Sequence, residues 1–132
     1  MKGFKSNIEK DALENNNFRK VLYTGKHLQL VLMSLKANEE IGAEIHHDND
    51  QFFRFESGTG KCVIDGNEYN VKDGDVIVVP AGAKHNIINT DGKRELKMYT
   101  IYSPPHHKDD IIRATKEDAE TNGAEFDGKT TE

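Results

Sequence analysis

Four residues of this sequence have side chains that could share a metal ion: Glu44, His46, Gln51 and His85. His85 closely follows Pro80-Ala81-Gly82. Proline cannot donate to a strand ladder and glycine tolerates positive φ, so this tripeptide predicts a tight turn between antiparallel strands. A histidine just after such a turn is held on a rigid element at the mouth of a sheet, which suits a metal ligand.

The upstream residues lie in Ala43–His47, a predicted strand. Alternate residues of a strand share a face, so Glu44 and His46 point one way while Ile45 and His47 point the other. If Glu44 and His46 are the inward pair, they lie across a turn from Gln51, and His85 closes the group. A surface carboxylate is the competing interpretation of Glu44.

The strand that follows, Gln51–Glu56, also has two distinct faces. Phe52, Arg54 and Glu56 carry two charges and are predicted to face outward. We therefore expect Gln51 to point inward above the rings of Phe53 and Phe55. These two phenylalanines are candidate walls of a ligand pocket beside the metal.

The predicted donor set contains two imidazoles, one carboxylate and one amide oxygen around a cavity. Two histidines and a carboxylate with open positions suit Zn(II), Fe(II), Mn(II) or Ni(II). An amide is a weak neutral ligand. Gln51 would bind through its oxygen or would orient a water molecule next to the ion, and the sequence leaves both roles open.

Short strands separated by turns fill the middle of the chain, with hardly any helix between them. Parallel strands would need long crossovers, so the pattern predicts an all-β, antiparallel sandwich or barrel. Helix is expected only near the ends, around Ile8 and over Asp109–Ala119. We expect an N-terminal polar segment with the first strand (1–26), a β-barrel (27–105) and a C-terminal polar helix and frayed tail (106–132).

The stretch Gly74–Asn89 resembles the second motif of the cupins, a jelly-roll superfamily. The motif G-x5-P-x-G-x2-H-x3-N matches at every position, which are Gly74, Pro80, Gly82, His85 and Asn89. The resemblance extends over roughly Leu30 to Pro105. It implies a double-stranded β-helix, the cupin barrel, with a divalent metal ion inside.

The first cupin motif, G-x5-H-x-H-x(3,4)-E-x6-G, matches less completely. Its last glycine falls on Gly58, which places Gln51 where cupins usually have glutamate. The second histidine is His46 with Glu44 in the first position, or His47 with Ile45 there. We prefer Glu44 and His46, because that register supplies two ligands.

Bulk composition restricts the partners and the compartment. The net charge is −5 and no Lys/Arg cluster is present, which argues against a nucleic-acid partner. No apolar run approaches a membrane span, and the N-terminal residues lack the apolar core of a signal peptide. The single cysteine, Cys62, has no internal partner and is read as a small buried hydrophobe, so we expect a cytoplasmic protein.

A homodimer is expected, because both faces of the strand Leu28–Leu35 are apolar and Phe52 faces outward. His106 and His107 follow Pro104-Pro105 and are interpreted as part of a solvated turn. The leading function is a small-molecule metalloenzyme of the isomerase, epimerase, cyclase or dioxygenase type, with its catalytic groups unassigned. A non-enzymatic module or sensor that binds a small ligand through the metal, and a cupin fold whose site has drifted, are the alternatives.

Overall fold

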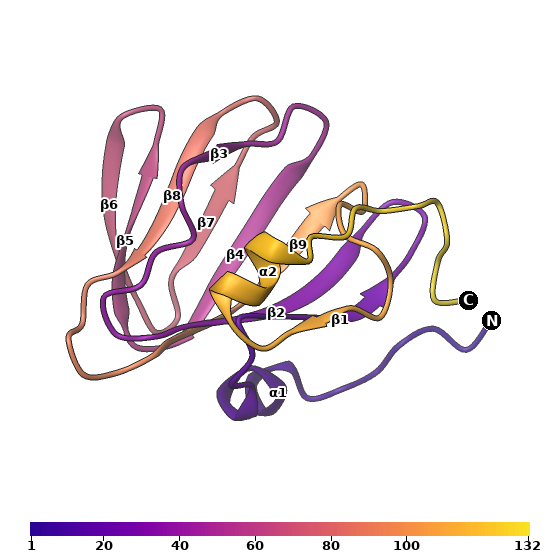
Figure 1. Cartoon of the computed structure of the whole chain (residues 1–132), viewed down its shortest axis with the longest axis horizontal. Helices are drawn as coiled ribbons and strands as arrows, with labels where there is room; N and C mark the ends of the chain where they lie inside the picture. Colours follow the sequence, from indigo (N-terminus) through magenta and orange to yellow (C-terminus); the bar gives the residue numbers. More distant parts are fainter.

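Antiparallel strands make up most of the chain, as predicted, and they form two sheets that pack face to face (Figure 1). The structure is a computed structural model that describes all of residues 1–132. Every strand pairing in both sheets is antiparallel. The all-β jelly-roll prediction is therefore confirmed.

The larger sheet has six strands. Their order across the sheet is β10 (Ile112–Arg113), β1 (Arg19–Thr24), β2 (Gln29–Leu35), β9 (Leu96–Ser103), β4 (Asp50–Ser57) and β7 (Val76–Val79). The strands β1 and β10, from either end of the chain, thus extend the sheet built by the central segment.

The smaller sheet has four strands. Their order is β3 (Glu44–Ile45), β8 (Lys84–Asn89), β5 (Thr59–Ile64) and β6 (Asn67–Lys72). The two-residue strand β3 pairs only with β8, so the start of β8 is the neighbour that fixes its position.

The core lies between the two sheets and follows the two-residue period of the strands. On β4 the burial alternates so that Gln51, Phe53 and Phe55 face inward, as predicted. Cys62 is also fully buried, as predicted, and this burial raises the pKa of its thiol to about 11, which disfavours the reactive thiolate.

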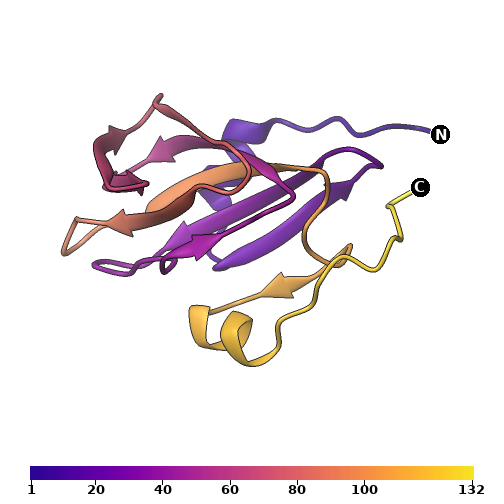
Figure 2. The ribbon, with the colours of Figure 1, turned by 90° about the horizontal axis from the view of Figure 1, so that it is seen from above.

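Two short helices cover opposite sides of the six-stranded sheet (Figure 2). The helix α1 (Ile8–Glu14) has Asn7 as its N-cap, and the Asn7 side chain accepts a hydrogen bond from the Lys10 backbone. Asn15 is the C-cap residue. It contacts β2, β4 and β9, and Leu32 beneath it is only 2% exposed. No helix of the chain is long and apolar enough to span a membrane.

The predicted helix over Asp109–Ala119 is wrong for most of that range. Asp110 adopts a positive φ of 62°, and the following β-branched residues form β10, which pairs with β1. The helix α2 (Lys116–Thr121) begins only after Thr115, whose hydroxyl accepts from the Asp118 backbone. Pairing with the free edge of β1 therefore outweighs the local helix propensity of this segment.

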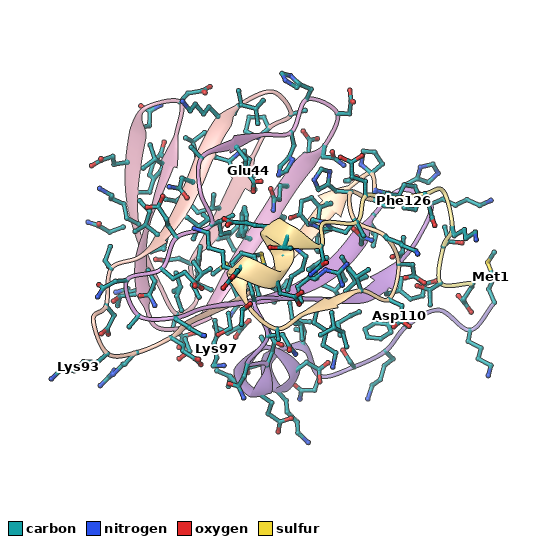
Figure 3. All side chains as sticks on the ribbon, viewed as in Figure 1. Met1, Glu44, Lys93, Lys97, Asp110 and Phe126 are labelled. Carbon is teal, nitrogen blue, oxygen red and sulfur yellow. The ribbon has the colours of Figure 1, made fainter.

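The predicted frayed tail is also corrected, because it pairs with the segment after β9. Phe126 donates its backbone N–H to His106 at 3.0 Å, and Lys108 donates to Ala124 at 3.1 Å. Figure 3 shows both Phe126 and Glu44 in the upper half of the molecule, and Phe126 lines the same cavity as His46. The tail thus lies across the end of the sheets where the candidate site is found.

Candidate metal centre

Three of the predicted ligands meet between the sheets. Glu44 on β3 lies directly opposite His85 on β8 in the antiparallel register, so their side chains share the inner face. Glu44 Oε1 lies 3.4 Å from His46 Nε2 and 4.0 Å from His85 Nε2. One ligand atom from each of Glu44, His46 and His85 lies within 4.8 Å of the other two.

The turn Pro80–Gly82 positions His46 as well as His85. Gly82 adopts a φ of 89°, which an L side chain rarely tolerates, and its N–H donates to the carbonyl of His46 at 2.9 Å. Ala81 N–H donates to the Asp50 carboxylate at 2.9 Å. The second motif therefore holds the loop that carries the histidine of the first.

Backbone contact fixes the tautomer of His85. Its Nδ1 lies 3.0 Å from the Ala83 carbonyl oxygen, which can only accept, so Nδ1 carries the proton. In the neutral ring Nε2 then has a free lone pair, and it points toward Glu44. This arrangement, in which one ring nitrogen donates to a carbonyl and the other is free, is typical of metal-binding histidines.

The unpaired atoms at the site fit a metal ion. His46 Nε2, His85 Nε2 and Gln51 Oε1 are all buried and lack a hydrogen-bond partner. Buried polar atoms without partners are rare, because each costs roughly 1–3 kcal/mol. Ligands about 2.0–2.2 Å from a divalent ion stand roughly 3–3.5 Å apart. The 3.4 Å between Glu44 and His46 lies in this range, and the 4.0 Å between Glu44 and His85 is somewhat longer.

Gln51 enters from the opposite sheet with its amide nitrogen already committed. Its Nε2 donates to the Thr100 hydroxyl at 3.0 Å, and its side chain is 1% exposed. The amide oxygen is therefore the free end. Both sequence-based roles for Gln51, direct ligand or orienter of water, use this oxygen and remain predictions.

The phenylalanines below Gln51 lie deeper than the ligand group. Phe53 and Phe55 have no exposed surface, and their rings stack with centroids 6.4 Å apart within the hydrophobic core. A role in a ligand pocket remains a prediction for both. His47, the competing histidine, is exposed and is absent from the ligand group.

Opposing influences set the ionisation of Glu44. Burial raises its pKa, but the neighbouring His46, His85 and Arg19 together lower that pKa by more, so the net shift is downward. The carboxyl group is therefore ionised at neutral pH and able to bind a cation.

His106 and His107 are not part of a solvated turn, contrary to the prediction. The His106 ring packs on His46 with centroids 4.3 Å apart and on Tyr102 at 5.2 Å. His107 is 8% exposed and its Nε2 lies 3.2 Å from the Tyr102 hydroxyl. Burial, followed by the charge of Arg19, lowers the pKa of His107 to about 2, so this ring is neutral.

Gln29 is the residue from which the burial of His106 and His107 could have been predicted. It is a polar residue on the otherwise apolar inner face of β2, and it is fully buried. Its amide oxygen accepts from the His106 and His107 backbones, while its nitrogen donates to the His107 carbonyl. An amide in an apolar strand thus indicated a polar segment folded against it.

A cavity of about 340 Å³ opens beside His46. Its walls come from the β3–β4 loop, the segment after β9 and the C-terminal tail; they include His46, Asn49, Pro105, His106, Glu125 and Phe126. Asn49 donates to the Pro104 carbonyl and joins the first two of these segments. The ligand group is therefore bordered by a cavity large enough for a small molecule.

A match to a family model defines the class of protein. The model described as a cupin domain matches residues 31–102, more than half of the chain. The chain therefore belongs to the cupin family, and it carries a Glu44/His46/His85 group that could hold a metal ion.

Individual proteins show similarity over most of the chain. The uncharacterized proteins YrkC of Bacillus subtilis and L612 of Acanthamoeba polyphaga mimivirus are 47% and 46% identical to it over 124 and 104 residues. These matches cover 89% and 76% of this chain but only 66% and 65% of the relatives, which are longer.

Among solved structures, BH2720 from Bacillus halodurans is similar with a TM-score of 0.87 and 42% identity. That match covers 89% of this chain and 93% of BH2720. Similarity to so much of a solved chain supports the two-sheet fold described above.

Proposed function

We propose that this protein binds a divalent metal ion through Glu44, His46 and His85 and uses it to act on a small molecule. The observation that carries the proposal is the set of buried ring nitrogens without partners that face one carboxylate. The donor types suit Zn, Fe, Mn or Ni. Gln51 would add its amide oxygen directly or through water.

Such an ion supplies Lewis-acid chemistry toward a carbonyl, or oxygen chemistry if it is iron. The side chains supply the rest of the site. Ala83 and the Pro80–Gly82 turn hold the two imidazoles in place, and the tail residues Glu125 and Phe126 border the cavity through which a ligand would enter. Isomerase, epimerase, cyclase and dioxygenase activities are the reaction types we propose.

Elemental analysis of protein purified without added metal tests the proposal. We expect about one equivalent of a transition metal per chain in the wild type, and less than about a tenth in His46→Ala and His85→Ala. Removing a nitrogen ligand leaves too few donors to hold the ion.

His47→Ala is the matched control, because it removes an adjacent but exposed imidazole. It should retain the wild-type metal content. Less than a tenth of an equivalent in the wild type would overturn the proposal, and loss of metal in His47→Ala instead of His46→Ala would show that the register of the first motif is slipped.

A non-enzymatic module that binds a small ligand through its metal is the second candidate. It is supported by Gln51, which occupies the place of the glutamate in the first cupin motif. An amide neither takes up nor releases a proton near neutral pH, so this position cannot act as a general base. Metal binding without turnover on keto-sugars, diketones and catechols would favour this candidate.

We further propose a cytoplasmic homodimer. On the outer face of the six-stranded sheet, Leu30, Ile101, Phe52 and Val78 are successive cross-strand neighbours, and Val78 is 60% exposed. The helix α1 covers Leu32 but leaves Leu28 46% exposed, so part of this apolar face is open. Sedimentation that detects only a 14.9 kDa species would contradict the dimer.

A further inference from the structure

The C-terminal tail places a phenylalanine next to His106. His107 and Glu125 form an isolated antiparallel bridge, and beside it Phe126 donates its backbone N–H to His106 at 3.0 Å. His106 and Phe126 are therefore directly opposed in the same register. Because opposed residues of an antiparallel pair share a face, the two side chains lie on the same side of the pair.

Both side chains border the cavity beside His46. His106 and Phe126 are among the residues that line it, and each is half-buried. Pro105, which precedes His106, adds further apolar surface to the lining. His106 and Phe126 are called the ring wall of the cavity below. The loop between β3 and β4 supplies most of the remaining lining, which includes His46 and Asn49.

The ring wall contacts the candidate metal centre directly. The His106 ring packs edge-on against His46 with centroids 4.3 Å apart. The buried Tyr102 ring stacks on His106 at 5.2 Å, so His106 is held by contacts with two other rings. A ligand that is bound at His46 and extends into the cavity would therefore lie against the ring wall.

Packing in the core does not explain the position of Phe126. This residue is outside the hydrophobic core and outside the group of partly buried residues that pack against it, although Ala124 belongs to that group. Phe126 also forms no pair with another aromatic ring. A large apolar side chain that lines a cavity on an otherwise polar tail indicates a surface for a ligand.

The lining of the cavity also restricts the charge of its ligand. It includes no lysine or arginine, and its two carboxylates, Asp48 and Glu125, are exposed. No positively charged side chain of the lining could hold a phosphate or carboxylate group. An uncharged ligand suits this lining better than a sugar phosphate does.

We propose that the ligand is an uncharged small molecule with a flat, unsaturated ring, which packs on the ring wall while oxygen atoms attached to it face the metal centre. Flat rings pack on other rings through offset or edge-on contacts that a puckered, saturated ring cannot reproduce. This inference rests on the proposed function and names its substrate class, which favours catechol-like and unsaturated diketone-like ligands over sugars.

Calorimetric titration of metal-loaded protein with three hydroxamic acids tests the inference. The hydroxamate group binds a divalent ion through two oxygens and is common to acetohydroxamic, benzohydroxamic and cyclohexanecarbohydroxamic acids. The first has no ring, the second has a flat ring and the third has a puckered ring of similar size. We expect wild type to bind the flat-ring probe about tenfold more tightly than the ringless probe and about fivefold more tightly than the puckered probe.

Phe126→Leu should lose most of this preference, because leucine keeps apolar volume but has no ring. The preference for the flat over the puckered probe should fall to about twofold or less, with acetohydroxamic acid binding and metal content unchanged. Phe126→Tyr keeps the ring and should retain the wild-type preference. Phe4→Leu is the matched control, because Phe4 is 45% exposed and lies outside the cavity.

The ringless probe separates this inference from the metal proposal. If acetohydroxamic acid binds but wild type does not prefer the flat ring, or if Phe126→Leu keeps the full preference, the ring wall is not a ligand surface even though metal is bound. Binding of the flat-ring probe that depends on Phe126 in chelator-treated protein would support the ring wall and contradict the metal centre. Binding of none of the three probes to metal-loaded protein would overturn the inference.

Discussion

His85 and Asn89 lie on the same face of β8 and are both buried, yet they use their polar atoms in opposite ways. The Asn89 amide nitrogen lies within hydrogen-bond distance of the Leu35, Lys36 and Arg94 carbonyls. Its oxygen accepts from the Asp91 backbone. His85 satisfies one ring nitrogen and leaves the other free. One side chain completes the fold and the other is left available to bind.

The same division runs along the interior. At the Asn89 end, the inner faces of β9 and β4 carry Leu96, Met98 and Phe55, none of which is exposed. At the His85 end they carry Tyr102 and Gln51, and Gln51 has a free oxygen. We infer that packing at one end supplies the stability that lets the other end keep unsatisfied polar groups.

The largest effect on stability is expected from Asn89→Leu. The two side chains have similar shapes, so the change mainly removes hydrogen bonds and leaves three carbonyl oxygens without the partner they share. We expect the free energy of unfolding to fall by about 3 kcal/mol, measured by urea denaturation. Metal content per folded chain should not change. A loss below about 1 kcal/mol would show that this end does not depend on its polar residue.

An effect of about 2 kcal/mol is expected from His107, a histidine that burial keeps neutral in the folded protein. Burial, with help from Arg19, lowers its folded pKa to about 2, whereas the unfolded chain takes up the proton near pH 6.5. The stability that neutral His107 confers is therefore complete above pH 6.5 and is lost as the pH falls from there toward 2. Between pH 7 and pH 5 the loss is about 2 kcal/mol.

Denaturation at both pH values, in wild type and in His107→Gln, measures this effect. Glutamine keeps a polar group near the Tyr102 hydroxyl but does not titrate, so its stability should fall by about 2 kcal/mol less than that of wild type over this interval. Equal losses in the two proteins would mean that His107 takes up its proton in the folded state as readily as in the unfolded chain.

Local patterns predicted the well-packed parts of both ends. Strand alternation placed Gln51, Phe53 and Phe55 on the inner face of β4, and the second motif predicted the turn before His85. These features depend on residues only a few positions apart. The two-residue period of a strand and the residue types of a turn were therefore sufficient to predict them.

Contacts between distant segments account for what the sequence analysis missed. His106 and His107 are buried because Gln29 and the C-terminal tail enclose them, and Asp109–Ala119 forms β10 because the edge of β1 is available. Such effects of tertiary context override local propensity.

The smallest effect on stability is expected from His85→Leu in metal-free protein. Leucine loses the contact of Nδ1 with the Ala83 carbonyl but also removes the buried Nε2 that has no partner, and the two changes oppose each other. We expect the free energy of unfolding to stay within about 1 kcal/mol of wild type, measured by urea denaturation in the presence of chelator. In the presence of metal, wild type should gain stability and the variant should not, because only the wild type binds the ion in its folded state. A loss as large as that of Asn89→Leu without metal would mean that His85 is a structural residue, and the contrast between the two ends of β8 would then be wrong.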